Sequence, residues 1–298
     1  MTTASVGEFQ SERALIAGAL LGEVPRYVEL LHARLAEAIR YALAGEGKRL
    51  RGILFLASYR AAGGSADASL LAAAIEIVHA YSLVHDDLPC MDDDAMRRGR
   101  PALHAAYDVR TATAAGLAMV PLAARVAFDG ARAVGLDDTE SASVVRELMH
   151  ASGAAGMVGG QLLDLSAEGR ELTLGEMEHV HSLKTGALIT ASARLGGLAA
   201  RANPAALGAL EAYGRAVGLA FQIADDVLDV TSTTDLLGKT AGKDLVFKKS
   251  TYPALLGVDG AMSRANDLVS SACDGLQSAG LLTPALESIA QFAIRRKN

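Results

Sequence analysis

HDDLPCMDDDAMRRGRP, residues 85–101, and FQIADDVLDV, residues 221–230, are the two stretches of this 298-residue chain from which its architecture can be worked out. Each places several aspartates at the edge of apolar sequence with helical periodicity. Like charges so close together repel one another, and carboxylates beside apolar surface are costly unless cations neutralise them. Because the candidate ligands are mainly carboxylates, we expect hard divalent cations such as Mg²⁺ or Mn²⁺. Mg²⁺ in turn commonly accompanies phosphate groups.

The two aspartate clusters differ in geometry. Asp225 and Asp229 are four residues apart, so on a helix both project from one face, one turn apart. Asp86 and Asp92 are six apart and would diverge on an uninterrupted helix, but Pro89 disfavours helix in the residue before it. We therefore expect the helix to end there and a short turn to bring Asp92 back beside Asp86. A solvated acidic loop is the alternative for one cluster, but it explains two clusters in one helical chain less well.

Length and composition indicate a single helical domain. A chain of this length would on average form about two domains. No Ser-, Pro- or Gly-rich linker divides it, however, so we expect one domain over residues 1–298. Hydrophobic residues make up 51% of the chain and aromatic residues 4%. The longest uncharged stretch, residues 148–163, is too short and too polar to span a membrane, so no membrane span is expected.

Charge and cysteine content limit the location and the partners. The first residues lack a basic start followed by an apolar run, so no secretory signal is expected. Two cysteines do not form a disulfide framework, and we therefore expect a reducing cytoplasm. A net charge of −6 without a basic stripe argues against a nucleic-acid partner.

Helical periodicity runs through almost the whole sequence. Apolar residues recur every three or four positions, and capping residues and glycines mark the ends of the segments. The expected boundaries are a helix from Pro25 to Gly45, a helix from about Asp67 to His85, a start at a Thr173–Glu176 capping box and a start at Asn203–Pro204. No alternating strand pattern and no solenoid repeat are present, so the expected fold class is all-α, a large helical bundle.

Basic residues follow both the expected helix end near Gly45 and the first aspartate cluster. Lys48, Arg49 and Arg51 follow a glycine pair directly, and Arg97 and Arg98 follow the first aspartates. Each alone would ordinarily be a solvated surface charge. Cationic sets combined with carboxylate sets suit two anions, one bound through metal ions and one held directly by cationic side chains.

A di-iron carboxylate bundle is an alternative from another class of protein. Such bundles take ligands from two Glu-x-x-His pairs on separate helices and from two further inward carboxylates. The pairs present are Glu76/His79, Glu147/His150, Glu176/His179 and Glu178/His181. This alternative leaves both aspartate clusters and the arginines without a role, and bound iron would be the observation in its favour.

Six motifs, in their order along the chain, resemble those of the short-chain trans-isoprenyl diphosphate synthases. They are GKRLR (47–51), HAYSLVHDDLPCMDDDAMRRGRP (79–101), GMVGGQLLDL (156–165), HSLKTGAL (181–188), FQIADDVLDV (221–230) and LGKTAGKDLVFKKSTYPALLG (237–257). The arrangement is most similar to the bacterial farnesyl diphosphate synthases of that family. The resemblance implies a homodimer of the isoprenoid synthase fold with a central active-site cavity. It also implies head-to-tail condensation of dimethylallyl or geranyl diphosphate with isopentenyl diphosphate.

The resemblance also assigns roles to individual residues. It implies that three Mg²⁺ ions on the allylic diphosphate are bound by Asp86, Asp92 and Asp225. The leaving group would be held by Arg97, Lys184 and Lys239, joined by Thr185 and Gln222. Isopentenyl diphosphate would be bound by Lys48, Arg51, His79 and Arg98. Contacts through water or hydrogen bonds are implied for Asp87, Asp226 and Asp229.

Tyr81 is the candidate for the residue that limits product length. It precedes Asp86 by five residues, which on a helix places it roughly 7.5 Å deeper. An aromatic ring in a close-packed interior is not easily displaced, so it can form the floor of a pocket. Together with Pro89 and Cys90, an aromatic residue at this position is typical of farnesyl synthases in the family, which implies a C15 product. A geranylgeranyl diphosphate synthase is the alternative.

Two positions depart from the family pattern. Gly52 stands where a proline usually follows KRLR, and Leu117 stands where the family usually has aspartate. We expect Gly52 to loosen the phosphate-binding segment and Leu117 to alter helix packing. Both aspartate clusters are intact, which favours an enzyme over a non-catalytic subunit.

Overall fold

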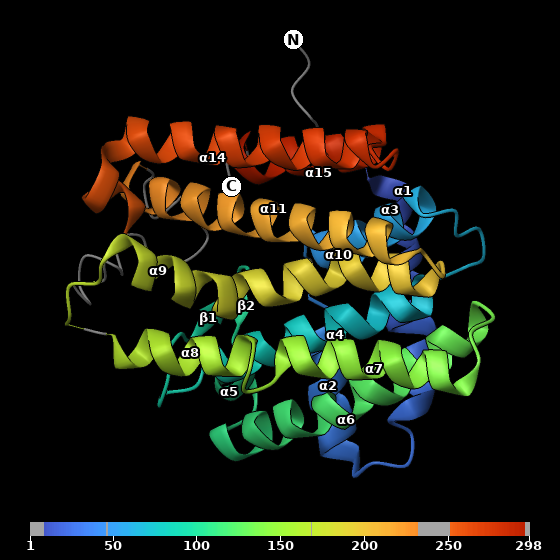
Figure 1. Ribbon diagram of the computed structural model, residues 1–298. Coiled ribbons are helices and arrows are strands. Elements are labelled where there is room, and N and C mark those ends of the chain that lie inside the picture. Colours follow the sequence, from blue (N-terminus) through green and yellow to red (C-terminus); the bar gives the residue numbers. More distant parts are fainter. Residues whose placement is uncertain (1–8, 46, 168, 232–250, 296–298) are drawn as a thin grey trace. The chain divides into compact units, whose positions relative to one another are not determined.

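The computed structural model describes residues 9–45, 47–167, 169–231 and 251–295 (Figure 1). Within these ranges almost all regular structure is helical. The strands described are β1 (Met96–Arg97) and β2 (Arg100–Pro101), which pair antiparallel with Arg97 opposite Arg100. The all-α fold class is therefore confirmed.

The chain divides into two compact units. Unit 1 comprises residues 1–56 and 66–146, and unit 2 comprises residues 57–65 and 147–298. Helices α3 (Leu50–Ala61) and α7 (Asp138–Ser152) contribute residues to both units. The single domain expected from the sequence stays a prediction.

Unit 1 is organised around helix α4 (Ser69–Asp86), which packs along α6 (Val109–Ala133) (Figure 1). Its other described elements are α1 (Gln10–Gly18), the π-helical η1 (Ala19–Glu23), the 3₁₀-helical η2 (Val24–Tyr27), α2 (Ala33–Leu43) and α5 (Leu103–Ala106). Every residue of α4 from position 69 to position 78 is buried. A helix buried on all sides belongs to the core, so the first aspartate cluster follows directly from a core element.

The long N-terminal helix expected from Pro25 is wrong. Pro25 lies in the short η2, and the backbone leaves helical geometry at His32 (φ −54°, ψ 133°) before α2 begins. Val28 is buried, whereas Leu30 is fully exposed. The apolar spacing continues across this break, so periodicity alone joined two separate elements. The expected end near Gly45 is confirmed, because α2 ends two residues earlier.

The other expected boundaries are confirmed to within about two residues. Helix α4 begins two residues after Asp67, whose side chain accepts the backbone N–H of Ser69. Helix α9 (Leu174–His181) begins with the expected capping box, because Thr173 and Glu176 exchange side-chain hydrogen bonds with each other's backbone N–H. Helix α11 (Pro204–Thr231) follows Asn203, whose side chain accepts a backbone N–H of the first turn at 2.9 Å.

Unit 2 is organised around the long helix α11 (Pro204–Thr231). Its other described elements are α8 (Met157–Ser166), the π-helical η3 (Ser182–Gly186), α10 (Ala187–Ala199), α14 (Tyr252–Ser278) and α15 (Pro284–Arg295). Helix α11 lies between α10 and α14 and packs against both (Figure 1). The buried Tyr213 hydroxyl also donates to the Leu286 carbonyl at 2.6 Å. The second aspartate cluster therefore lies on a helix that other elements hold firmly in place.

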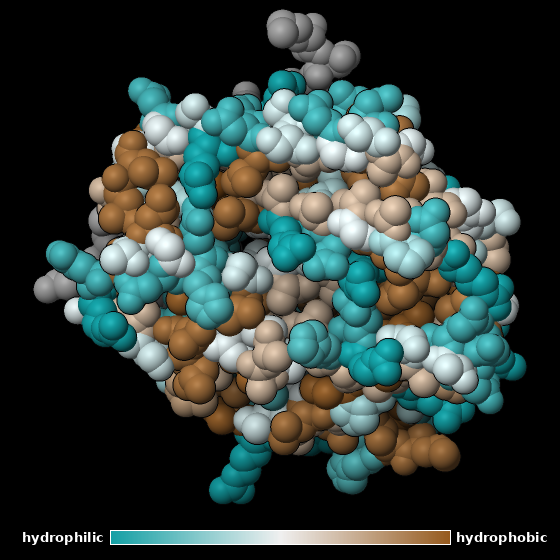
Figure 2. All heavy atoms as spheres, in the orientation of Figure 1, coloured by the Kyte–Doolittle hydropathy of each residue, from teal (hydrophilic) through white to brown (hydrophobic). Residues whose placement is uncertain are grey.

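Apolar residues also reach the surface. On the face shown in Figure 2, hydrophobic and hydrophilic side chains are interspersed. Leu117 on α6 is 63% exposed, and the altered helix packing expected there stays a prediction. Among the described helices, α6 alone is long and apolar enough to cross a membrane, with 44% of its apolar stretch buried. Core helices of soluble proteins have the same length and composition, so the expected lack of a membrane span stays a prediction.

Candidate active site

The first aspartate cluster forms a turn at the end of α4. The helix ends at Asp86, and the backbone N–H of Asp92 donates to the Asp86 carbonyl oxygen at 2.8 Å. This bond confirms the turn expected from Pro89. Both aspartates are partly exposed, whereas the Asp87 side chain between them in sequence is buried. The turn therefore presents carboxylates where a cation can reach them.

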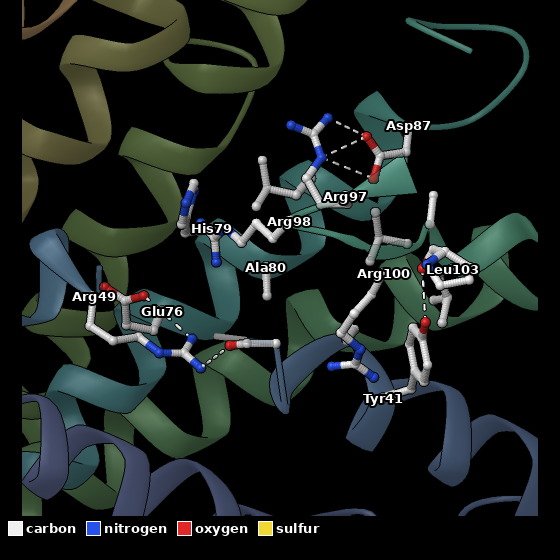
Figure 3. A pocket seen from close by; sticks show the side chains of 16 residues that line it. Tyr41, Arg49, Glu76, His79, Ala80, Asp87, Arg97, Arg98, Arg100 and Leu103 are labelled. Atoms are coloured by element: carbon white, nitrogen blue, oxygen red, sulfur yellow. Dashed lines mark hydrogen bonds and ion pairs between the residues drawn. The ribbon is translucent and has the colours of Figure 1, made fainter. Parts of the chain in front are cut away.

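Asp87 is engaged by Arg97 of the β1–β2 hairpin (Figure 3). Arg97 Nε donates to the two carboxylate oxygens at 2.9 and 3.2 Å, and Nη2 contacts the same carboxylate. The Asp87 residue is 3% exposed. Burial raises the pKa of this carboxyl group, while the bond from Arg97 opposes that shift. Asp87 therefore holds the hairpin arginine and is not an accessible metal ligand.

A cavity in unit 1 lies beside this ion pair, between α2, α4 and the hairpin (Figure 3). Its charged residues and its one histidine are Arg49, Glu76, His79, Asp87, Arg97, Arg98 and Arg100. Four arginines therefore face two carboxylates, and both carboxylates are buried and bound to protein groups. An excess of guanidinium groups in a concave site suits a phosphate-bearing anion.

Arg51 and His79 meet beside this cavity. Arg51 Nη1 lies 3.4 Å from His79 Nε2. Because arginine only donates, His79 has to accept through a neutral imidazole. Burial, followed by the Arg51 guanidinium, holds the pKa of His79 well below its ordinary value. The structure thus brings together Arg51, His79 and the cavity residue Arg98, while the Lys48 side chain is exposed.

Lys184 and Thr185 lie in η3, the π-helical segment between α9 and α10. Such segments occur often at functional sites. Lys184 Nζ forms an ion pair with Asp164 Oδ2 of α8 at 2.7 Å. A Cβ atom on Gly160, also in α8, would overlap the backbone nitrogen of Lys184, so a larger residue would separate α8 from η3. The motif GMVGGQLLDL therefore positions Lys184.

A chain of hydrogen bonds joins Thr185 to the second aspartate cluster. Thr185 Oγ1 donates to Gln222 Oε1 at 3.0 Å, and Gln222 Nε2 donates to Asp226 Oδ1 at 3.0 Å. The backbone N–H of Tyr252, at the start of α14, donates to Asp226 Oδ2 at 3.1 Å. Asp226 is 4% exposed. It therefore fixes the orientation of the Gln222 amide.

The two other aspartates of this cluster are suited to a cation. Asp225 is partly exposed, and Asp229 lies one turn further along α11. Asp229 Oδ2 is buried and has no hydrogen-bond partner among the described residues. In the described ranges, no three His, Cys, Asp or Glu side chains converge as a preformed metal site. The orphaned oxygen and the carboxylate donors nevertheless fit a hard divalent cation.

Other expected residues have mixed outcomes. Tyr81 is buried and touches His85 edge to face, with 6.0 Å between ring centroids, so its location suits a pocket floor. Lys239 lies outside the described residues. Gln161 and Asp164 belong to a motif that the sequence reveals, but the sequence alone predicted no role for either side chain. Gln161 is buried, and neither atom of its amide group has a hydrogen-bond partner within the described part of the chain.

The Glu-x-x-His pairs do not form a di-iron arrangement. Each glutamate is engaged with another protein group: Glu76 with Gly52 and Arg49, Glu147 with Arg194, Glu176 with Thr173, and Glu178 with Arg264. These contacts use the carboxylates for structure and leave the di-iron alternative without support.

Known proteins resemble this chain in sequence and in structure. The family model described as polyprenyl synthetase matches residues 32–279. The farnesyl diphosphate synthase of Escherichia coli (strain K12) is 45% identical over 267 residues, which cover 88% of this chain and 89% of that protein. The geranylgeranyl diphosphate synthase of Cyanophora paradoxa is 40% identical over 264 residues, covering 88% and 87%. A Helicobacter pylori geranyltransferase, solved with magnesium and isoprenyl diphosphate, has a TM-score of 0.81 and 31% identity, covering 99% and 97%.

Proposed function

The chain belongs to the polyprenyl synthetase family, and we propose that it is a prenyltransferase that makes farnesyl diphosphate. It joins dimethylallyl or geranyl diphosphate head to tail with isopentenyl diphosphate and releases pyrophosphate. The observation that carries the proposal is the arginine-lined cavity beside the carboxylate turn of α4. This arrangement serves one anion through metal ions and another through guanidinium groups.

Magnesium is the proposed cofactor, with three ions per active site, and Mn²⁺ suits the same oxygen ligands. Asp86, Asp92 and Asp225 would hold the ions on the allylic diphosphate. The magnesium in the Helicobacter pylori relative supports this choice, as does the Asp229 oxygen that has no hydrogen-bond partner among the described residues. When bound, Mg²⁺ supplies positive charge that stabilises the diphosphate as a leaving group.

The cationic side chains of this protein add to that charge. Arg97 and Lys184 would hold the leaving group, together with Lys239. The first two are restrained by carboxylates, Arg97 by Asp87 and Lys184 by Asp164. Cations that are already oriented stabilise developing charge without reorganising during the reaction.

Two neutral side chains would face the carbocation that forms when the allylic carbon–oxygen bond breaks. The Thr185 hydroxyl and the Gln222 carbonyl oxygen carry partial negative charge, and their mutual hydrogen bond fixes both. Surrounding apolar helix faces would exclude water until the isopentenyl double bond attacks. The released pyrophosphate then takes the final proton, so no side-chain base is required.

The second substrate, isopentenyl diphosphate, would bind to Lys48, Arg51, His79 and Arg98. Three of these residues lie in or beside the arginine-lined cavity. Because His79 is neutral, the positive charge at this subsite comes from the lysine and the arginines.

Product length, assembly and location belong to the same proposal. The buried Tyr81 and the similarity to the Escherichia coli enzyme favour a C15 product. The geranylgeranyl synthase of Cyanophora paradoxa keeps C20 as the second candidate. We propose a homodimer in the cytoplasm, because the family resemblance implies a dimer and the cysteine content suits a reducing compartment.

A product assay tests the proposal. The purified chain is incubated with Mg²⁺, isopentenyl diphosphate and either dimethylallyl or geranyl diphosphate, and the products are separated by chain length. We expect a C15 product whose formation stops when EDTA removes the metal. A C20 main product would establish the geranylgeranyl alternative. Absence of chain elongation with both starters would refute the prenyltransferase assignment.

A further inference from the structure

Glu76 is a buried carboxylate at the edge of the arginine-lined cavity (Figure 3). It is 2% exposed. Its Oε1 accepts the backbone N–H of Gly52 at 2.9 Å, and its Oε2 lies 3.7 Å from Arg49 Nη1. Both contacts go to the segment that carries Lys48 and Arg51, so Glu76 ties this segment to α4.

The bond to Glu76 gives the Gly52 N–H, at the N-terminal end of helix α3, a hydrogen-bond partner. Gly52 is the third residue of α3, and the N–H groups in a first helical turn have no partner inside the helix. The carboxylate of Glu76 supplies that partner from α4. Negative charge near a helix N-terminus is also favourable because of the helix dipole. The start of α3 is therefore anchored to a core helix.

Arg49 extends this anchor to a third helix. Its Nη2 donates to the carbonyl oxygens of Leu43 and Gly45, at 3.0 and 2.7 Å, at the end of α2. The Arg49 backbone is left-handed, with φ of 52°, which turns the chain between its neighbours. The Arg49 guanidinium is therefore engaged with groups of the protein itself. The direction in which the Arg51 side chain projects from α3 depends on these contacts.

We propose that Glu76 is a positioning residue that orients Arg51 and Lys48 for isopentenyl diphosphate, through the Gly52 N–H and Arg49. This inference rests on the proposed function. It differs from the expectation that Gly52 loosens the segment, because a proline in its place has no N–H to donate. In this chain glycine therefore supplies an anchor that proline cannot provide.

Two substitutions at position 52 separate the N–H from steric effects. A Cβ atom there would lie 2.8 Å from Ile16 Cδ1 and 3.3 Å from Glu76 Cγ. Alanine and proline both add this atom, and the flexible end of Ile16 can move aside. Proline is tolerated in the first turn of a helix, so its main additional effect is loss of the N–H. Gly52→Ala is therefore the matched control for Gly52→Pro.

The experiment measures KM for each substrate and kcat in the product assay. For Gly52→Pro we expect KM for isopentenyl diphosphate to rise about tenfold, because a hydrogen bond to a charged acceptor is lost. For Gly52→Ala we expect all constants to stay within about twofold of wild type. KM for geranyl diphosphate should change little in either variant. Equal KM values for isopentenyl diphosphate in the two variants would overturn the proposal.

A second variant keeps the test decisive if Gly52→Pro does not fold, which thermal unfolding followed by circular dichroism will show. Glu76→Gln keeps an oxygen acceptor for Gly52 and removes the charge that faces Arg49. We expect a selective rise in KM for isopentenyl diphosphate. An unchanged KM, or equal rises for both substrates, would overturn the inference. An inactive wild-type enzyme would instead refute the proposed function, so the two failures are distinguishable.

Discussion

The two aspartate clusters contain the same Asp-Asp pair but bury its second member against different partners. In unit 1, Asp87 contacts the guanidinium group of Arg97. In unit 2, Asp226 accepts from the Gln222 amide and from the backbone N–H of Tyr252, which are both neutral donors. One buried carboxylate thus holds a cation, and the other holds a dipole.

The two aspartates of each pair are neighbours with the same chemistry, yet they have separate tasks. In each pair the first aspartate, Asp86 or Asp225, is partly exposed, and the second is buried. A buried carboxylate needs internal donors, because burying an unpaired charge is costly. The exposed member remains accessible to a metal ion.

The largest expected effect concerns the exposed members. Asp86→Ala and Asp225→Ala should each lower kcat by about a thousandfold or more, because stabilisation of the leaving group is lost. The measurement is turnover at saturating substrates and Mg²⁺. Asp93→Asn, at an exposed neighbouring position, is the control and should retain nearly full activity. Near-normal turnover in either alanine variant would contradict the proposal that both clusters bind the metal ions.

Substitution of the buried members should sharpen the contrast. Asp87→Asn should lower the free energy of unfolding by about 1–3 kcal/mol and raise KM for the allylic diphosphate, because Arg97 loses its charged partner. Asp226→Asn should mainly lower kcat, by about tenfold, because a misplaced Gln222 amide weakens transition-state stabilisation. Urea denaturation and steady-state kinetics measure these effects. If both variants changed KM, kcat and stability in the same way, the separate roles proposed for Asp87 and Asp226 would be wrong.

The helices that carry the two clusters also differ in the side chain five residues before each Asp-Asp pair. This position holds Tyr81 in α4 and Ala220 in α11, and both residues are buried. Tyr81→Ala should shift the product from C15 towards C20, because the proposed floor is removed. Ala220→Gly, the control, should leave the product unchanged. Chromatography of the products measures the shift, and an unaltered distribution in Tyr81→Ala would exclude this residue as the determinant of length.

The smallest expected effect is on how stability depends on pH, through His79 in the arginine-lined cavity of unit 1. The lowered pKa keeps His79 neutral in the folded protein, whereas the unfolded chain takes up a proton below about pH 6.5. Stability from this group is therefore present above that pH and is lost as pH falls, by at most about 1.4 kcal/mol per pH unit. His79→Gln should reduce the loss between pH 7 and pH 5.5. Urea midpoints at the two pH values measure it, and parallel losses in wild type and variant would contradict it.

Features that depend on neighbours in sequence could be predicted from the sequence. The capping box at Thr173, the start of α11 after Asn203 and the turn at Pro89 are all present. The helix expected from Pro25 was also predicted from neighbours in sequence, and it is wrong. There the apolar spacing continued through a break between two elements, so periodicity did not reveal that the helix stops.

The sequence by itself determined the all-α class, the family and the positions of both aspartate clusters, because these follow from local patterns and ordered motifs. Only the tertiary structure decided which aspartates are buried and what each one holds. Lys184 lies 20 residues from Asp164, and Tyr252 lies 26 residues from Asp226. Such pairs form when folding brings distant segments together and removes water from their charges, and no local pattern records that event.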